Sequence, residues 1–323
     1  MSSLTLQALR NREDPDLRLL VIGDPVDHSL SPPMHNAGLE FLHLPCRYGR
    51  LRVRPEDLRK AFRVLRGQDF IGWNLTLPHK IAAVDLMDGL DPLAERLGAV
   101  NTVVNQSGRL FGFNTDGRGL VAAIAEAFGC CVSSVRIALL GAGGGAGQAA
   151  ARYLSELNVP LLILLNRTAA KAERLAYELA DSSETEIRVE SWENFPEVCG
   201  EVDLIVNASS AGLDGGPVHE ALNSIEARHL VFDMVYGPQE TPLVHFAREK
   251  GARSADGLLM LLYQGVLAFE IWFGKPAPAQ VMREALFRAA GRSERGEVRR
   301  QKAKGRRQKA EGKRQKRARS EHR

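Results

Sequence analysis

The sequence predicts a two-domain α/β protein that ends in a basic tail. Strands and helices alternate over the first 115 residues, and a strand at 135–140 runs into a glycine-rich loop and an alanine-rich helix. Residues 291–323, by contrast, show no apolar periodicity. Alternation of short strands with helices is typical of βαβ units. A chain of 323 residues is also long enough for two domains with ordinary cores.

The first predicted domain spans residues 1–116 and is expected to contain a parallel sheet. Its apolar runs predict strands at 18–23, 70–77, 99–104 and 110–113. A turn at Ser107 and Gly108 would join the last two strands. A helix is expected to begin near residue 31, with Ser31 as its N-cap and Pro32 at its first helical position.

The second predicted domain, residues 117–256, contains a glycine-rich loop between the strand at 135–140 and a helix that reaches Leu157. The loop consists of Gly141, Ala142, Gly143, Gly144, Gly145 and Ala146. Its spacing matches the Rossmann fingerprint, in which glycines let the backbone approach a pyrophosphate at a helix N-terminus. The alternative is a tight turn without a ligand, but the strand before the loop and the helix after it favour a dinucleotide site. Further strands are expected at 161–165, 203–207 and 230–234.

The end of the strand at 161–165 indicates which dinucleotide is bound. NAD-preferring domains usually place an Asp or Glu there, to hold the ribose 2′-hydroxyl. This chain has Asn166, Arg167 and Thr168, followed by Lys171. A guanidinium can hold a 2′-phosphate by charge-assisted hydrogen bonds. The alternative is that Arg167 and Lys171 are solvated and bind no ligand. It is disfavoured, because positive charges at the N-terminus of a helix oppose the helix dipole. The sequence therefore predicts NADP rather than NAD.

The C-terminal part of the chain divides into a long apolar helix and a charged tail. The helix is predicted at 257–274, and residues 257–290 are expected to return to the first domain. Residues 291–323 hold 15 Lys or Arg and 4 Glu, a net charge of +11, so the preceding residues carry about −7 of the total of +4. The tail is expected to be disordered, or at most to form a helix on a partner. It would either act as a solubiliser or contact nucleic acid weakly and without sequence preference.

The composition is that of a soluble globular protein, with 44% hydrophobic and 25% charged residues. No apolar run approaches the roughly 20 residues that span a bilayer. The N-terminus lacks a signal-peptide pattern, so the cytoplasm is the expected location. The four cysteines show no CxxC spacing, so reduced thiols are expected and no metal site is predicted.

Lys80 and Asp116 are the candidate catalytic residues. A lysine is protonated at neutral pH and can donate to a carbonyl oxygen, and a nearby carboxylate would favour its charged form. Two unrelated surface charges would be the simpler interpretation. However, polar side chains gather near the ends of the predicted strands, where ligands bind in open α/β sheets. These are Asn74, Thr76, Asn101, Asn114 and Thr115.

Two serines before the first predicted helix, Ser29 and Ser31, permit two interpretations. They could be a turn residue and a helix cap, or they could form a cradle for a carboxylate. Local pattern does not distinguish the two.

Eight motifs, in family order, resemble the shikimate dehydrogenase family over about residues 18–290. Four lie in the first domain: Ser29-Leu30-Ser31-Pro32-Pro33-Met34-His35-Asn36, Asn74-Leu75-Thr76-Leu77-Pro78-His79-Lys80, Gly98-Ala99-Val100-Asn101-Thr102 and Asn114-Thr115-Asp116-Gly117. Four lie later: the loop at 141–146, Asn166-Arg167-Thr168, Asp233-Met234-Val235-Tyr236 and the segment at 256–264. The resemblance implies reversible NADPH-dependent reduction of 3-dehydroshikimate to shikimate, in aromatic amino-acid (chorismate) biosynthesis.

The same resemblance implies roles for individual residues. Ser29 and Ser31 would hold the substrate carboxylate, and Lys80 with Asp116 would be the catalytic pair. The ring hydroxyls would be bound by Asn74, Thr76, Asn101, Asp116 and Gln264, with Tyr236 nearby. The nicotinamide half of the cofactor would be approached by Met234, Gly257 and Met260.

Trp73 and the basic tail depart from the family pattern. Trp73 is bulkier than the residue expected before Asn74 and could reshape a wall of the pocket, while the tail has no counterpart. Two alternatives stay open: a quinate/shikimate dehydrogenase of broader specificity, and a non-catalytic shikimate or quinate sensor with a nucleic-acid-binding tail. The sequence also leaves open whether the protein is a monomer or a homodimer. It leaves open too whether Lys80 or a water relay takes the proton during oxidation.

Overall fold

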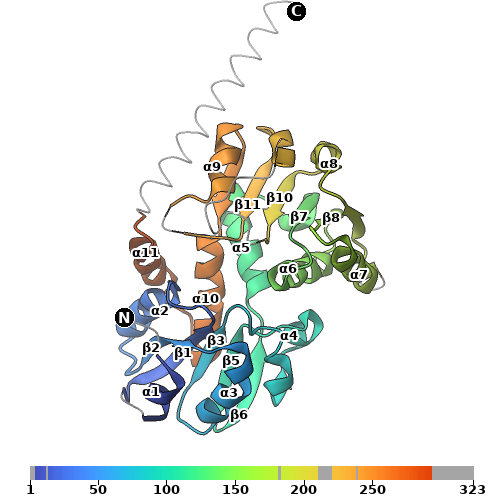
Figure 1. Cartoon of the computed structure of the whole chain (residues 1–323). Coiled ribbons are helices and arrows are strands. Elements are labelled where there is room, and N and C mark those ends of the chain that lie inside the picture. The colour runs from blue at the N-terminus through green and yellow to red at the C-terminus, as the bar shows by residue number, and fades with distance from the viewer. Residues whose placement is uncertain (1–3, 12–13, 181–182, 210–219, 238, 293–323) are drawn as a thin grey trace, which may run out of the picture.

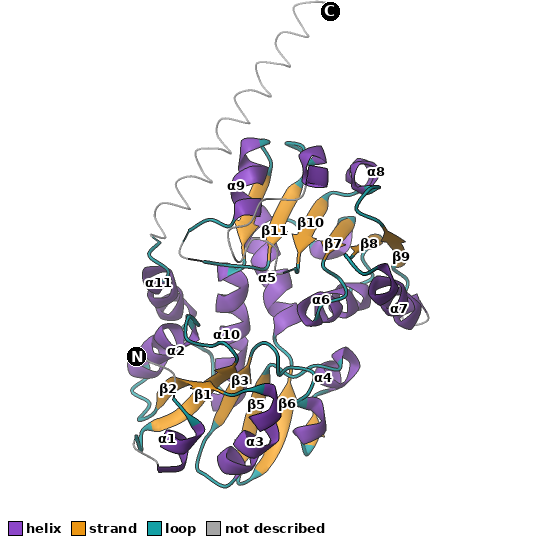
Figure 2. Ribbon diagram, viewed as in Figure 1, coloured by secondary structure: helices purple, strands orange, loops and turns teal. Residues whose placement is uncertain are grey.

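The computed structural model describes residues 4–11, 14–180, 183–209, 220–237 and 239–292, which fold into two lobes (Figure 1). Each lobe is built on a six-stranded sheet with helices packed against it (Figure 2). The predicted two-domain α/β class is therefore confirmed. Only Gly291 and Arg292 of the predicted basic tail lie among the described residues, so the expectation of disorder concerns residues outside them.

The first sheet has the strand order β2-β1-β3-β5-β6-β4. Its strands are β1 (Leu17–Gly23), β2 (Arg47–Arg52), β3 (Gly72–Leu75), β4 (Gly89–Leu90), β5 (Thr102–Gln106) and β6 (Arg109–Phe113). Its helices are α1 (Leu6–Asn11), α2 (Ser31–Phe41), α3 (Leu58–Arg66) and α4 (Pro92–Leu97). The strands predicted at 70–77 and 99–104 are thus present, but their boundaries are shifted.

This sheet is mixed, which corrects the expectation of a parallel one. β1 is parallel to β2 and β3, whereas β5 is antiparallel to β3 and β6. The reason lies in the turn at Ser107 and Gly108, which have φ values of 53° and 90°. A two-residue turn with positive φ at both positions makes a tight hairpin, and only antiparallel strands can be joined in this way.

The start of α2 also differs from the prediction. Leu30, rather than Ser31, is the N-cap, and Ser31 is the first helical residue. A capping side chain accepts a hydrogen bond from the second or third helical N–H. Counted from Leu30, the second and third helical residues are Pro32 and Pro33, and neither has an N–H. A side-chain cap at residue 30 would therefore find no donor in the first turn. The Ser31 N–H itself is directed to Ser29 Oγ at 3.3 Å.

Successive residues of the central strands face opposite sides of the first sheet. Trp73 is fully buried on the face covered by α3, where its ring meets Phe62 edge-on at 5.3 Å. Asn74 therefore faces the opposite side. Trp73 does not form a wall beside Asn74, and the expectation that it could reshape the pocket is wrong.

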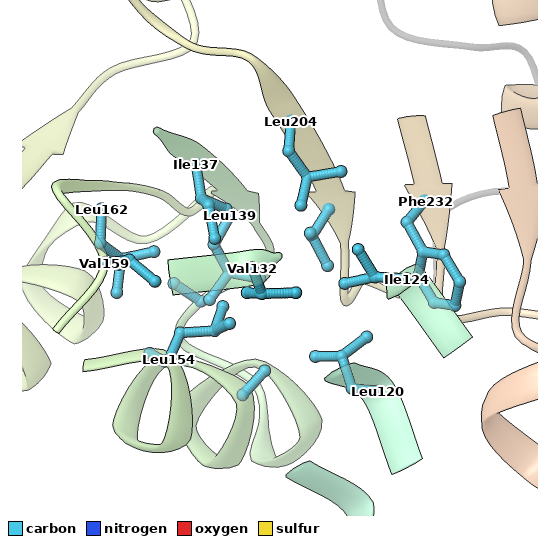
Figure 3. Close-up of a cluster of buried hydrophobic side chains, with 14 of the residues drawn as sticks. Leu120, Ile124, Val132, Ile137, Leu139, Leu154, Val159, Leu162, Leu204 and Phe232 are labelled. Atoms are coloured by element: carbon cyan, nitrogen blue, oxygen red, sulfur yellow. The ribbon is translucent and has the colours of Figure 1, made fainter. Parts of the chain in front are cut away.

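The second sheet is parallel throughout, with the order β12-β11-β10-β7-β8-β9. Its strands are β7 (Ile137–Leu140), β8 (Leu161–Leu165), β9 (Glu186–Glu190), β10 (Leu204–Asn207), β11 (Leu230–Asp233) and β12 (Arg253–Asp256). Its helices are α6 (Gly145–Glu156), α7 (Ala169–Ala180), α8 (Phe195–Glu201) and α9 (Pro242–Glu249). Figure 3 shows part of its core, a cluster of buried side chains that includes Leu139 and Leu204 from the sheet and Leu154 from α6.

Two long helices connect the lobes: α5 (Asp116–Phe128) and α10 (Leu258–Phe273), which pack side by side (Figure 1). α10 reaches the first sheet, where Trp272 Nε1 donates to the Val103 carbonyl at 3.0 Å. This contact supports the predicted return of residues 257–290 to the first domain, which stays a prediction. α11 (Ala279–Ala289) follows and packs on α2. None of the helices in the described ranges is long and apolar enough to cross a membrane.

Candidate active site

The candidate lysine lies on a rigid loop that follows β3. Its neighbour His79 is buried and donates a ring hydrogen bond to the Val53 carbonyl at 2.7 Å. Burial lowers the pKa of His79, so the ring is neutral at pH 7. The Lys80 carbonyl accepts from the Val100 amide at 2.9 Å. The loop backbone is thereby held on both sides of the lysine.

Lys80 and Asp116 form an ion pair at the edge of the first lobe. Lys80 Nζ lies 2.7 Å from Asp116 Oδ2, with 26% and 13% of the two side chains exposed. Asp116 is the first residue of α5, and its amide donates to Asn114 Oδ1 at 3.0 Å. The ammonium group is thus aimed by a nearly buried carboxylate while part of it stays accessible.

Asn101 is the centre of a hydrogen-bonded group that includes this carboxylate. Its Nδ2 donates to Asp116 Oδ1 at 3.0 Å and to Thr115 Oγ1 at 2.9 Å, and it lies 3.4 Å from Gln264 Oε1. Gln264 comes from α10, so residues far apart in the sequence meet here. The Thr115 hydroxyl also donates to the Gln264 carbonyl at 3.0 Å.

Asn74 extends the group along the sheet. Its Nδ2 donates to the Asn101 carbonyl at 3.1 Å and to Thr102 Oγ1 at 3.0 Å. Both amide protons are therefore used within the protein, and Asn74 Oδ1 is left to accept hydrogen bonds. Thr76 follows β3 directly, with a half-exposed side chain whose methyl lies against Gly23.

Tyr48 is a functional candidate that sequence reasoning missed. Its buried hydroxyl donates to Asn74 Oδ1 at 2.7 Å and is also hydrogen-bonded to the side chain of Ser31. Because its one proton goes to Asn74, Ser31 is the donor in the second bond. His35 stacks on the Tyr48 ring at 4.4 Å and supports it from behind. Tyr48 thus joins the serine pair to the amide group around Asn101.

The serine pair is close to a cation and to a second tyrosine. Arg50 donates to the Ser29 carbonyl from Nε at 3.1 Å and from Nη2 at 2.5 Å. Burial raises the pKa of Tyr48 and that of Tyr236, and the charge of Arg50 opposes the rise in both. Tyr236 belongs to the second lobe but is hydrogen-bonded to the Leu30 backbone. Hydroxyls and one guanidinium therefore converge where an anionic substrate group could bind.

The glycine loop on the second lobe has the close packing that a dinucleotide site requires. Gly141 has a φ of 79°, and a Cβ on Gly147 would lie 2.2 Å from the Gly141 carbonyl oxygen. Gly144 is the N-cap of α6 and has no side chain to cap the first helical N–H groups. These donors remain available to an anion. The loop therefore fits a pyrophosphate.

The residues expected to select the cofactor lie beside this loop. Asn166 Oδ1 accepts from the Gly143 amide at 3.1 Å, and Asn166 Nδ2 donates to the Thr168 carbonyl at 2.8 Å. Lys171 lies close to Gly143: a Cβ added to Gly143 would be 2.7 Å from the Cβ of Lys171. The side chains of Arg167 and Lys171 are exposed. This arrangement suits the phosphate of an NADP ribose.

The residues expected near the nicotinamide gather where β11 and β12 end. A Cβ on Gly257 would lie 2.2 Å from the Met234 carbonyl oxygen, and the Gly257 amide donates to the Val235 carbonyl at 3.0 Å. Met234 and Met260 both contact the apolar core of the second lobe. The two methionines and Gly257 therefore lie close to the point where the segment that carries Tyr236 leaves β11.

An ammonium group paired with a carboxylate on one lobe and a glycine loop of the dinucleotide-binding type on the other are features of a two-lobed NADP-dependent oxidoreductase. Models of three families match the chain: the shikimate dehydrogenase substrate-binding domain over residues 21–103, shikimate/quinate 5-dehydrogenase over 123–235, and the shikimate 5′-dehydrogenase C-terminal domain over 257–287. The chain belongs to the shikimate dehydrogenase family.

Individual relatives support this assignment. The chain is 39% identical over 271 residues to a shikimate dehydrogenase (NADP(+)) of Desulforamulus reducens, covering 82% of this chain and 93% of that protein. Shikimate 5-dehydrogenase of Thermus thermophilus, solved in complex with NADP(H) and shikimate, is 38% identical with a TM-score of 0.75, over 84% and 99% of the two chains. Quinate dehydrogenase of Corynebacterium glutamicum, in complex with NAD, is 30% identical with a TM-score of 0.74, over 84% and 99%.

Proposed function

We propose that this protein is an NADP-dependent shikimate dehydrogenase that catalyses the reversible reduction of 3-dehydroshikimate to shikimate. The observation that carries the proposal is the 2.7 Å contact between Lys80 Nζ and Asp116 Oδ2, within a group of side chains suited to a hydroxylated ring. A sensor would need to bind such a ring, but it would not need a directed proton donor. The enzyme is therefore favoured over the sensor.

In the proposed complex the substrate lies along the first lobe. Its carboxylate would be bound by Ser29 and Ser31, with Tyr236 and the charge of Arg50 nearby. The ring hydroxyls would meet a set of polar side chains on the first sheet and on α10: Asn74, Thr76, Asn101, Asp116 and Gln264. Since Asn74 uses both amide protons internally, we propose that its Oδ1 accepts a hydrogen bond from a ring hydroxyl.

The proposed chemistry divides between the cofactor and the lysine. NADPH, when bound, supplies the hydride for the carbonyl carbon. Lys80 donates a proton to the oxygen on which negative charge develops, and Asp116 keeps the amine directed at that oxygen. In the oxidation direction the alcohol proton leaves either to Lys80, in its neutral amine form, or to a water relay.

The cofactor would be held by residues of the second lobe. The loop at 141–146 would bind the pyrophosphate, and the 2′-phosphate would be held by Asn166, Arg167, Thr168 and Lys171. The nicotinamide would lie near Met234, Gly257 and Met260. The lobes would act as the domains predicted at 1–116 and 117–256, with residues 257–290 attached to the first.

The assay that tests this function is oxidation of shikimate with NADP by the purified protein, followed at the absorbance of NADPH, with quinate in parallel. We expect shikimate to be the better substrate by kcat/KM. Comparable efficiency with quinate would favour the broader enzyme, an alternative that the resemblance to quinate dehydrogenase keeps open. No turnover of either compound, with retained binding of shikimate, would favour the sensor.

The cofactor preference should depend on Arg167. We expect kcat/KM with NADPH to exceed that with NADH by roughly 10–100-fold, the scale of one charge-assisted hydrogen bond. Arg167→Ala should remove most of this difference by weakening NADPH alone. Arg174→Ala is the matched control, because Arg174 is an exposed arginine on α7, the helix that follows Arg167, and pairs with Glu178. Equal efficiency of both cofactors in the parent would refute the role of Arg167.

The basic tail is a second binding element in this proposal. Residues 293–323 contain 14 Lys or Arg and no Phe, Tyr or Trp, a composition that suits weak, non-specific contact with nucleic acid. Deleting residues 293–323 should leave shikimate oxidation within about twofold and abolish retention on single-stranded DNA. Retention by the full chain should fall steeply between roughly 50 and 200 mM salt. Binding that survives the deletion, or ignores salt, would contradict this role. We also propose a cytoplasmic location and, as the oligomeric state, either a monomer or a homodimer.

A further inference from the structure

Arg292, where the basic tail begins, is folded back into the body of the protein. α11 ends in a Schellman motif, in which the Arg292 amide donates to the Phe287 carbonyl at 2.9 Å and the Gly291 amide to the Arg288 carbonyl at 3.1 Å. Gly291 has a φ of 69°, which reverses the chain direction. The Arg292 side chain is only 12% exposed. This arginine thus differs from the tail cations that composition alone would group with it.

The guanidinium of Arg292 contacts two segments of the second lobe. Its Nη1 lies 2.5 Å from Asp256 Oδ2, and that carboxylate side chain is 7% exposed. Its Nη2 donates to the carbonyls of Gly237 and Gln239, both at 2.9 Å. One side chain therefore ties the end of β12 to the segment that follows β11.

These two segments carry the residues placed between substrate and cofactor. Asp256 Oδ1 accepts a hydrogen bond from the Leu258 amide at 3.1 Å. Leu258 is the first residue of α10 and follows Gly257 directly. Tyr236 directly precedes Gly237 and is hydrogen-bonded to the Leu30 backbone on the other lobe. Movement of the Gly237 carbonyl would therefore move Tyr236.

The site also needs a cation for electrostatic reasons. Asp233 and Asp256 are register partners on β11 and β12, and both are buried. Burial raises the pKa of Asp233, and the neighbouring Asp256 contributes to the rise. Asp233 is supported by Thr241 and Asn207, which are neutral. Arg292 supplies the positive charge at Asp256.

We propose that Arg292 is a positioning residue: it holds the segment of Tyr236 against the end of β12 and so sets the substrate end of the cleft. The inference rests on the proposed function. It concerns a residue that lies outside the eight motifs of the resemblance. It also assigns the first part of the tail to the enzyme itself, so that only the residues beyond it are available to other partners.

The test compares Arg292→Gln with Arg288→Gln, which removes an equal charge from the exposed face of α11. At a temperature where both are folded, Arg292→Gln should raise KM for shikimate by roughly tenfold, the scale of one charge-assisted hydrogen bond, with a smaller change in kcat. Arg292→Lys should recover part of the loss. Adding Asp256→Asn to Arg292→Gln should also recover part of the increase in KM, because it removes the buried Asp256 charge that the loss of Arg292 leaves unpaired. Arg288→Gln should behave as the parent.

A second readout does not depend on turnover. Amide hydrogen exchange in peptides covering residues 230–240 should accelerate in Arg292→Gln and stay unchanged in Arg288→Gln. If the parent is active and Arg292→Gln changes neither KM nor exchange, or only lowers the melting temperature, the positioning role is wrong. If the parent does not oxidise shikimate, the proposed function fails, and the exchange comparison still decides whether Arg292 holds the segment.

Discussion

Lys80→Ala is expected to lower kcat for shikimate oxidation by about 10²–10⁴-fold, the usual contribution of a positioned proton donor or acceptor. KM should stay within several-fold of the parent, because most substrate contacts come from other side chains. The lysine is held on both sides of its backbone by His79 and Val100 and is directed by Asp116. Its loss should therefore remove a transition-state interaction and leave the site in place.

The control for this variant is Lys60→Ala. Lys60 is an exposed lysine on α3 of the same lobe, and its amine lies 3.9 Å from Asp57. That substitution should leave kcat and KM unchanged. Steady-state kinetics with both substrates separates the two constants. A Lys80→Ala enzyme with kcat near that of the parent would exclude the lysine from proton transfer.

Asp116→Ala is expected to damage both kcat and KM. The carboxylate accepts from Lys80 through one oxygen and from Asn101 through the other, so its removal releases the amine and takes one of the acceptors from the buried Asn101 amide. Hydrogen bonds to charged groups contribute about 1.5–3 kcal/mol each, so losing two should lower kcat/KM by about 10²–10⁴-fold.

Two comparisons define the role of Asp116 more closely. Asp116→Asn keeps an acceptor oxygen but removes the charge, so we expect KM to recover more than kcat. Asp57→Ala removes an exposed carboxylate from the same lobe, paired with Lys60, and should have no effect. If Asp116→Ala raised KM alone, the residue would bind substrate without acting on the lysine.

Much of the site could be predicted because its parts are local motifs. The strand, glycine loop and helix around residue 141 are contiguous, and the loop lies where the spacing of small residues indicates. Asn166, Arg167 and Thr168 follow a strand directly, so their place beside the loop follows from the βαβ unit. Asn101, Asn114 and Thr115 also lie next to the ends of short strands.

The strand directions of the first sheet also have a local signal in the sequence. The two-residue turn at Ser107 and Gly108 already indicates a hairpin, and a hairpin excludes a fully parallel first sheet. This specific stereochemical rule outweighs the general pattern of alternating strands and helices. The prolines at 32 and 33, by contrast, do not exclude a cap at Ser31, because Met34 would then be the third helical residue and has an N–H; only the structure shows that the helix begins one residue earlier.

Tyr48 and Arg292 had no comparable signal. Tyr48 lies between arginines in a strand without clear alternation, and only the fold places its hydroxyl between Ser31 and Asn74. Arg292 is one of fifteen cations in the tail region, and only a helix-end turn separates it from the others. Residue counts do not separate these two residues from others of the same type. Their burial and their hydrogen-bond or ion-pair partners in the folded protein do.

The amino-acid order therefore accounts for what neighbouring residues decide among themselves: the alternation of strands and helices, the glycine loop, the chemical types at each strand end, and the family. The folded chain alone decides which of these meet. Gln264 reaches Asn101, Tyr236 reaches Leu30, and Arg292 reaches Asp256 because two sheets and the helices between them close over long stretches of sequence. Such contacts depend on the packing of whole elements, and short-range stereochemistry does not encode them.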